Sequence, residues 1–243
     1  MSEGTWRTHR LELSDQTLRD WDATVLAAGP DGIVLDRSAF YPGGGGQPPD
    51  EGVLLWGGVQ TRIAGARKGD DLYLIPADGE PLPSPGAPVR GALDDQRRSA
   101  LMRTHSALHV LCGVVFRDFG ALVTGGNMEP LTARMDFNLA EVPAGFKESV
   151  ESACNAEVLA DRRIDVRVLP RAEAFEIPDI IRTATNLVPV AVTEVRIIDI
   201  NGLDVQADGG THVASTKQVG QIEIAKIENK GKGFRRVRLR VRD

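Results

Sequence analysis

The chain has 243 residues, of which 42% are hydrophobic and 26% are charged, and its formal net charge is -5. This composition is ordinary for a globular protein with a substantial core, and the net charge argues against a surface that is basic throughout, although a local basic patch remains compatible with it. No apolar run approaches the roughly 20 residues that span a membrane, and residues 1–10 lack the layout of a signal peptide. Two cysteines cannot form a disulfide framework, so we expect a cytoplasmic protein.

Residues 1–93 predict a small all-β domain, because short apolar clusters alternate there with Gly and Pro. The clusters 24–28 and 33–36 flank Gly29-Pro30-Asp31-Gly32, a strong turn sequence, and we expect them to form a β-hairpin. Short strands in such numbers are typical of a barrel, and the further ones are expected at 52–56, 60–65 and 71–75. Prolines 81, 83, 85 and 88 then predict a stiff connector, with a domain boundary between residues 93 and 94.

A run of four glycines, residues 43–46, lies between two of these strands. Its simplest interpretation is a flexible hairpin loop, because glycine adopts positive φ without strain. A phosphate-binding P-loop is not supported, since the Lys-Ser/Thr pair of that motif is absent. Two aromatic residues and a proline before the run, and Gln47 after it, favour a loop of defined shape.

A long helix is expected from Asp94-Asp95, because acidic residues there would cap it and meet its positive end. Apolar residues and one histidine recur along it at spacings of four and three, which predicts a buried stripe of Leu101, His105, Leu108, Cys112 and Val115. His109 borders the same stripe. Both histidines should therefore face the interior or a cleft.

The remainder, residues 94–243, predicts an α+β domain with helices packed on a largely antiparallel sheet. We expect a turn at 125–127, a strand at 131–137 and a helix after Pro143 with one apolar face. Later strands are expected at 164–170 and 194–200, and a terminal hairpin at 222–228 and 234–242.

His105 and His109 lie four residues apart, which places both imidazoles on one helical face at a spacing typical of metal ligands. The alternative is a pair of hydrogen-bonded core histidines. Zinc suits imidazole nitrogens in a site without redox chemistry. The helical metalloprotease motif needs a Glu directly after its first His, and Ser106 occupies that position, which excludes this class.

Asp208-Gly209-Gly210-Thr211-His212 could supply the other half of a metal site. A Gly-Gly turn can fold back so that positions 208 and 212 converge, although an Asx turn with an incidental surface histidine is the alternative. Cys112 shares the stripe of His105 but lies two turns, about 10 Å, along the helix from it. We therefore interpret Cys112 as a core residue.

Residues 103–109 (Arg-Thr-His-Ser-Ala-Leu-His) and 208–213 (Asp-Gly-Gly-Thr-His-Val) together resemble the alanyl-tRNA editing family. This family comprises freestanding AlaX-type proteins and the equivalent domain of alanyl-tRNA synthetase. Residues 35–47, with the glycine run, are similar to its glycine-rich element, so the resemblance covers nearly the whole chain. One departure is clear, because the late motif of the family usually begins with Cys, where this chain has Asp208.

The resemblance implies hydrolysis of the ester that joins a wrong amino acid to tRNA(Ala), with Ser-tRNA(Ala) and Gly-tRNA(Ala) as substrates. It implies a zinc ion held by His105, His109, Asp208 and His212, with the three histidines as the catalytic set. Substrate binding is expected for Gly44, Gly45, Gln47, Thr104, Gln206 and Thr211, although Gln206 could instead contact the metal-ligating residues. The chain leaves no room for a synthetase core, so no use of ATP is expected, and no membrane partner.

The partner implied is the acceptor end of a mischarged tRNA, and the terminal hairpin has a basic face that could meet it. Arginines alternate with apolar residues along the last strand, so that their side chains share one face. The candidate tRNA-binding residues are Arg236, Arg238, Arg240, Lys230 and Lys232. The alternative is a solvated strand face balanced by acidic neighbours.

Two other functions remain open on the sequence alone. One is a non-catalytic tRNA-binding module with a structural metal or none, because the usual Cys ligand is replaced. The other is a metal hydrolase that acts on another small ester or amide. The oligomeric state is not indicated by the sequence.

Overall fold

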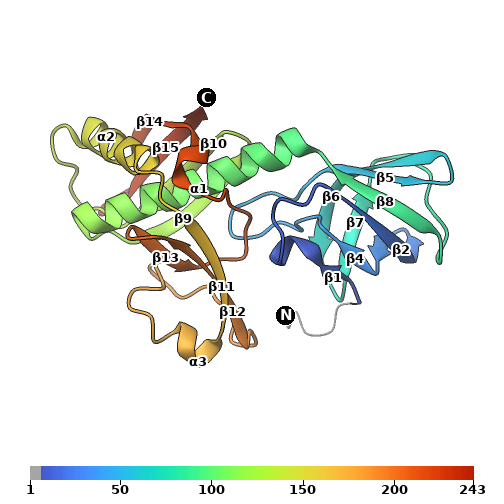
Figure 1. Cartoon of the computed structure of the whole chain (residues 1–243). Coiled ribbons are helices and arrows are strands. Elements are labelled where there is room, and N and C mark those ends of the chain that lie inside the picture. Colours follow the sequence, from blue (N-terminus) through green and yellow to red (C-terminus); the bar gives the residue numbers. More distant parts are fainter. Residues whose placement is uncertain (1–6) are drawn as a thin grey trace. The chain divides into compact units, whose positions relative to one another are not determined.

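The computed structural model describes residues 7–243, which divide into two compact units. One unit ends at Ser99 and the other runs from Ala100 to Asp243 (Figure 1). The domain boundary predicted between residues 93 and 94 lies shortly before this division and stays a prediction. The first six residues, part of the segment in which we expect no signal peptide, lie outside the described residues.

The first unit is a closed antiparallel barrel with the strand order β2-β3-β7-β6-β5-β8. Its strands are β2 (Asp20–Gly29), β3 (Gly32–Leu35), β5 (Gly52–Trp56), β6 (Val59–Lys68), β7 (Leu72–Pro76) and β8 (Pro88–Leu93). Two short strands, β1 (His9–Arg10) and β4 (Arg37–Ser38), pair beside it, and a 3-10 turn spans Leu11–Leu13. The interior is filled by inward-facing apolar side chains such as Ile33, Leu54 and Leu74.

The hairpin predicted on either side of residues 29–32 is confirmed, because β2 and β3 pair across that turn, with Val25 opposite Leu35. The connector predicted up to position 88 is wrong at its end, since Pro88 is the first residue of β8, which pairs with β2 and β5 and closes the barrel. Proline is tolerated at the start of a strand. Gly91 interrupts the apolar pattern of β8 because a Cβ there would lie 2.4 Å from the Trp21 ring.

The second unit contains a four-stranded antiparallel sheet of order β14-β15-β10-β9. Its strands are β9 (Val123–Glu129), β10 (Thr132–Phe137), β14 (Gln221–Asn229) and β15 (Arg235–Arg242). Helix α2 (Phe146–Leu159) packs against β14. Most of helix α1 (Asp95–Phe119) also belongs to this unit, and its apolar side chains join those of α2 and of the sheet in one core.

The three elements predicted most directly by their periodicity are confirmed. The stripe of α1 from Leu101 to Val115 is buried, and so are the apolar residues that α2 repeats at every fourth position. The terminal hairpin forms from β14 and β15. The turn predicted at 125–127 is wrong, because those residues lie within β9, and the chain turns instead at 130–131, where Leu131 has φ 62.

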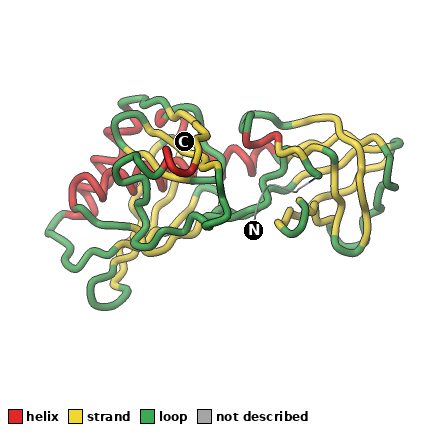
Figure 2. Tube along the Cα trace, turned by 90° about the horizontal axis from the view of Figure 1, so that it is seen from below, coloured by secondary structure: helices red, strands yellow, loops and turns green. Residues whose placement is uncertain are grey.

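A smaller antiparallel sheet of order β11-β12-β13 completes the second unit. Its elements are β11 (Ile164–Pro170), β12 (Glu194–Ile200) and β13 (Asp204–Ala207), with the short helix α3 (Arg171–Ala174) after β11 and a 3-10 turn at Thr216–Val219. Strand β12 is buried on both faces, because Val195 and Ile197 join a small satellite core while Ile198 and Ile200 join the main one. Figure 2 shows that more of the chain lies in strands and loops than in helices. The predicted fold class, a barrel followed by an α+β unit, is confirmed.

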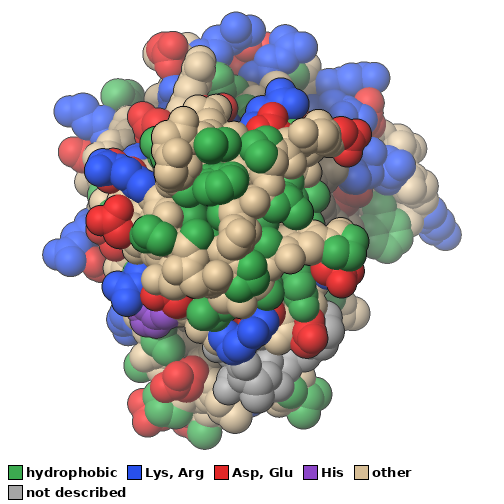
Figure 3. Space-filling view, turned by 90° about the vertical axis from the view of Figure 1, so that its right-hand side faces the viewer, with side chains coloured by type: hydrophobic (Ala, Val, Ile, Leu, Met, Phe, Trp, Pro, Cys, Tyr) green, Lys and Arg blue, Asp and Glu red, His purple; other side chains and the backbone are tan. Residues whose placement is uncertain are grey.

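The surface mixes charges of both signs. On the face shown in Figure 3, hydrophobic side chains gather near the centre, with charged side chains around them. Among residues 7–99 of the barrel unit, the large hydrophobic side chains that are exposed are Leu55, Val59 and Leu82. Within residues 7–243, no helix combines the length and the apolar character needed to cross a membrane.

Candidate metal centre

Helix α1 presents His105 and His109 from its buried face. Both residues are almost inaccessible, with 4% and 5% of their surface exposed. Their ring centroids lie 5.2 Å apart, as expected for neighbours separated by one helical turn.

The loop after β13 brings Asp208 and His212 to the same place. The N–H of Gly210 donates to Oδ2 of Asp208 over 2.5 Å, which folds the loop back at its two glycines. Arg196 on β12 holds the loop from the other side, because its Nη1 donates to the carbonyl oxygens of Asp208 (3.0 Å) and Gly210 (2.8 Å). The side chains of Asp208 and Arg196 therefore hold the loop through its backbone groups, while the Asp208 carboxylate and the His212 ring also face α1.

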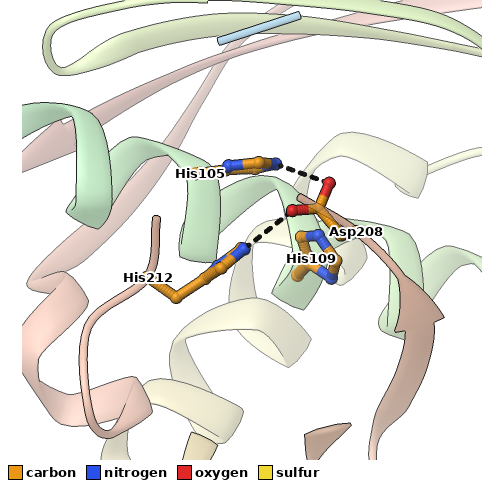
Figure 4. Close-up of side chains that lie close together, drawn as sticks. All are labelled: His105, His109, Asp208 and His212. Atoms are coloured by element: carbon orange, nitrogen blue, oxygen red, sulfur yellow. Dashed lines mark hydrogen bonds and ion pairs between the residues drawn. The ribbon is translucent and has the colours of Figure 1, made fainter. Parts of the chain in front are cut away.

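The four side chains converge on one point (Figure 4). Their possible ligand atoms all lie within 4.8 Å of one another. Asp208 lies between two rings, with Oδ1 3.5 Å from Nε2 of His105 and Oδ2 3.3 Å from Nε2 of His212. The ring of His212 is centred 4.3 Å from that of His105 and 4.8 Å from that of His109.

The ligand atoms of this group lie close enough to face one metal ion, because all are within 4.8 Å of one another. Bond lengths of about 2.0–2.1 Å to nitrogen or oxygen place neighbouring ligand atoms of a zinc ion roughly 3.3 Å apart, and Nε2 of His105 and Nε2 of His212 lie 3.5 and 3.3 Å from different oxygens of Asp208. Three imidazoles and one carboxylate are also ligands that zinc accepts. The group could therefore hold a metal ion.

The pKa values of the cluster follow from burial and from two carboxylates, Asp208 within the cluster and Asp204, whose Oδ2 lies 3.0 Å from Nδ1 of His109. Burial lowers the pKa of His105 to about 4, so this ring is neutral at pH 7 and keeps a lone pair for a metal. Burial and the neighbouring His105 lower the pKa of His212 well below its ordinary value. For His109 burial acts in the same direction, but the hydrogen bond to Asp204 and the charges of Asp204 and Asp208 outweigh it and raise the pKa. Burial raises the pKa of Asp208, but the facing histidines outweigh it and lower the pKa well below the ordinary value.

Two buried side chains next to the cluster were not predicted from the sequence. Asp204 accepts a hydrogen bond from Nδ1 of His109 over 3.0 Å, and Ser106 lies with its Oγ 3.2 Å from Nδ1 of His212. A signal for Asp204 was available, because alternation along a strand places residues 204 and 206 on the same face. For Ser106 the sequence indicates only that the Glu of a metalloprotease is absent.

In the second unit, the residues that we expect to bind substrate make contacts within the protein itself. The hydroxyl of Thr104 donates to the carbonyl oxygen of Ala100 (2.7 Å) and accepts the N–H of Leu131 (2.8 Å). Thr211 is buried in the loop beside His212, and Gln206 donates to Oδ2 of Asp204 over 2.6 Å. Their roles in substrate binding stay predictions. Cys112 is buried and lies outside the group of candidate ligands, which agrees with a core residue.

The glycine run forms a tight, ordered turn in the barrel unit. Gly44 and Gln47 exchange two backbone hydrogen bonds of 3.0 Å each, and the hydroxyl of Tyr41 donates to the carbonyl oxygen of Gly44 over 3.0 Å. Gly44 and Gly45 have φ of 131 and 59, which only glycine adopts without strain. The loop therefore has a defined shape, while the substrate-binding role of Gly44, Gly45 and Gln47 stays a prediction.

A buried ion pair holds the base of this turn. Asp50 accepts the N–H of Tyr41 (2.7 Å) and pairs with Arg98, whose Nη2 lies 2.5 Å from Oδ2 of Asp50 and 2.6 Å from the carbonyl oxygen of Ala39. The side chains of Arg98 and Asp50 are 0% and 1% exposed. The pair therefore ties both ends of segment 39–50 to the first turn of α1.

Four arginines of β15, Arg236, Arg238, Arg240 and Arg242, share one face, as the alternation predicts, but each of the four has an acidic partner. Arg236 forms two hydrogen bonds with Asp136, of 2.7 and 2.8 Å, and the other three pair with glutamates on β14. These pairs are Arg238 with Glu228 (3.0 Å), Arg240 with Glu223 (3.8 Å) and Arg242 with Glu223 (2.5 Å). Lys230 and Lys232 are exposed in the turn. The contacts agree with a balanced strand face, and the tRNA-binding role of the set stays a prediction.

A comparison with models of known protein families finds one match within this chain. Residues 195–238, which include Asp208 and His212, match the family model described as the threonyl and alanyl tRNA synthetase second additional domain. The matched region thus resembles a domain of threonyl- and alanyl-tRNA synthetases and carries two of the four candidate ligands.

Relatives that match over nearly the whole chain are more specific. Alanyl-tRNA editing protein AlaX-M of Saccharolobus solfataricus is 37% identical over 234 residues, which is 95% of this chain and 97% of the relative. The protein of the same name from Methanosarcina mazei is 34% identical over 239 residues, or 95% of both chains. An alanine–tRNA ligase of Pyrococcus furiosus is 34% identical over 233 residues, which cover 25% of the ligase. This chain belongs to the AlaX-M family of alanyl-tRNA editing proteins.

Proposed function

We propose that this protein is a metal-dependent deacylase that hydrolyses the ester between a wrong amino acid and tRNA(Ala). The observation that carries the proposal is the buried group His105, His109, Asp208 and His212 in a chain whose relatives are named alanyl-tRNA editing proteins. We propose Ser-tRNA(Ala) as the main substrate and Gly-tRNA(Ala) as a second one. Such a substrate would place the activity in the cytoplasm, where translation occurs.

Zinc is the metal that we propose, because three imidazoles and a carboxylate suit a redox-inactive ion. When bound, zinc would polarise the ester carbonyl or lower the pKa of a water molecule. The histidines would hold the ion in a site that their burial shields from bulk water. Asp208 is the most exposed of the four, with 14% of its side chain accessible, compared with 5% for His105 and 0% for His212. We therefore propose that substrate approaches beside Asp208 and that this carboxylate gives way to it.

The experiment is a deacylation assay of the zinc-loaded protein with Ser-tRNA(Ala), Gly-tRNA(Ala) and correctly charged Ala-tRNA(Ala). We expect hydrolysis of the first two and much slower hydrolysis of the third. A chelator and His105→Ala should both abolish it. His9→Ala is the matched control, because His9 is the one histidine outside the cluster and is exposed on β1. Absence of hydrolysis by the metal-loaded protein would defeat the enzyme proposal for these substrates.

A non-catalytic tRNA-binding module with a structural metal is the second candidate. The observation that favours it is the number of candidate ligands, because four protein ligands close a tetrahedral site and leave no position for substrate. Zinc retention and tRNA binding without deacylation would support this candidate over the first.

We also propose that the partner is the acceptor end of tRNA and that the arginines of β15 contribute to binding it. Arg238 and Arg240 are exposed, and their pairs with glutamates are of the surface type that exchanges partners at little cost. Removal of each arginine that binds a phosphate should reduce the slope of log affinity against log salt by roughly 0.7 to 0.9. If the double variant Arg238→Gln/Arg240→Gln has the same slope of log affinity against log salt as wild type, then β15 does not contribute to tRNA binding.

A further inference from the structure

Asp204 is a buried carboxylate directed at the metal cluster from β13, a strand that supplies none of the four candidate ligands. Its Oδ2 lies 3.0 Å from Nδ1 of His109, and the residue is 1% exposed. We propose that Asp204 is the positioning residue of the centre and that it fixes the ring of His109 for metal binding. The inference rests on the proposed metal site and adds to it a residue that touches neither metal nor substrate.

The chemistry of imidazole explains why this contact matters. A neutral ring has a single N–H, and the nitrogen that donates it is lost as a metal ligand. With the proton on Nδ1 and donated to Asp204, Nε2 of His109 keeps its lone pair for the cluster. A carboxylate partner also makes the opposite nitrogen a better donor to a metal ion. Asp204 thus selects the tautomer, the orientation and the basicity of one ligand.

Asp204 is itself held firmly. A buried carboxylate is costly unless it is paired and hydrogen-bonded. Its Oδ2 also accepts Nε2–H of Gln206 over 2.6 Å, and its Oδ1 accepts Nε–H of Arg182 over 3.3 Å. Arg182 in turn stacks over the ring of Phe116, with 3.8 Å from its guanidinium carbon to the ring centre. Gln206 on β13 and Arg182 in a loop therefore orient the carboxylate toward His109. Phe116 on α1 supports Arg182 in turn.

His212 provides an internal comparison, because its Nδ1 faces a neutral partner. Oγ of Ser106 lies 3.2 Å from that nitrogen and also accepts the N–H of Val213 over 3.2 Å. A hydroxyl can fix the ring orientation but cannot supply the charge that raises its basicity. Removal of Asp204 should therefore weaken metal binding more than removal of Ser106.

The test measures zinc affinity by competition with a chromophoric chelator, in protein whose fold is checked by circular dichroism. We expect Asp204→Asn to bind zinc about 10- to 100-fold more weakly than wild type, and Ser106→Ala to lose less. Asp199→Asn is the matched control, because Asp199 lies in the same small sheet and pairs at the surface with Arg167. A folded Asp204→Asn protein with wild-type affinity would overturn the proposal.

A second measurement separates positioning from general support of the fold. In the metal-free protein labelled with nitrogen-15 histidine, the signal of His109 should show the proton on Nδ1, and this signature should change in Asp204→Asn while those of the other rings stay. If Asp204→Asn does not fold, Gln206→Leu serves instead, because it removes one contact that aims Asp204 and should weaken zinc binding by several-fold. If Gln206→Leu binds zinc with the affinity of wild type, the proposal is contradicted. These readouts do not involve tRNA, so failure of the deacylase proposal leaves them interpretable.

Discussion

Replacement of Asp50 by Asn should destabilise the barrel unit strongly, because it leaves the charge of Arg98 buried without a counterion. The carboxylate of Asp50 accepts Nε–H of Arg98 (3.0 Å to Oδ1), Nη2–H of the same side chain (2.5 Å) and the N–H of Tyr41 (2.7 Å). Arg98 has no access to solvent through which to recover its hydration. Removal of one partner from such a buried pair costs about 3–5 kcal/mol.

A surface pair in the same unit provides the reference. Asp20 and Arg90 lie 2.6 Å apart, but their side chains are 54% and 58% exposed, so Asp20→Asn should cost less than about 1 kcal/mol. The double variant Asp50→Asn/Arg98→Met removes the stranded charge as well as its partner. It should recover much of the stability that the single variant loses, because the cost lies in the unpaired charge.

The assay is urea unfolding followed by tryptophan fluorescence. All three tryptophans lie in the first 99 residues, so the signal reports on the barrel unit and not on the α+β unit. With the single variant Arg98→Met added, the free energies of unfolding of wild type, Asp50→Asn, Arg98→Met and the double variant form a cycle that isolates the coupling between the two residues. The reasoning would be refuted if Asp50→Asn cost no more than Asp20→Asn, or if the double variant were less stable than the single one.

Two further predictions concern the strands. A Cβ added in Gly52→Ala would lie 2.3 Å from a carbonyl oxygen of β8, so the barrel should lose about 1–3 kcal/mol, and an unchanged urea midpoint would contradict this. The hydrogen bond to Arg236 lowers the pKa of Asp136 in the folded protein. The pair therefore stabilises the fold above about pH 4 and loses this contribution as pH falls through the lowered pKa. The stability difference between wild type and Asp136→Asn should shrink on acidification, and a constant difference would exclude the linkage.

The regular elements were predictable where a short stretch of sequence contains its own signal. The apolar repeat of α1 and the Gly-Pro-Asp-Gly turn between β2 and β3 each depend on neighbours in the chain. Strand β8 was not predictable in this way, because Gly91 is required by the ring of Trp21, which is distant in sequence. The glycines of β9 likewise suggested a turn, since their extended conformation depends on pairing with β10.

The candidate site shows the same division. The spacing of His105 and His109 is local, and so is the contact between the Gly210 N–H and the Asp208 carboxylate that folds the loop back. The contact between Asp204 and His109 depends on how β13 lies against α1, which no local pattern contains. The acidic partners of the β15 arginines also come from neighbouring strands, so the sequence alone suggested a more positive face than the structure has.

The carboxylate at position 208 has a consequence for the durability of the centre. A thiolate ligand can be oxidised to sulfenic acid or a disulfide, and the metal is then released. All four candidate ligand atoms here are nitrogen or oxygen, and the two cysteines of the chain are buried, with pKa values that burial raises, to about 12 for Cys154. Both remain as unreactive thiols. A metal held by this cluster would therefore outlast oxidants that empty a sulfur-ligated site.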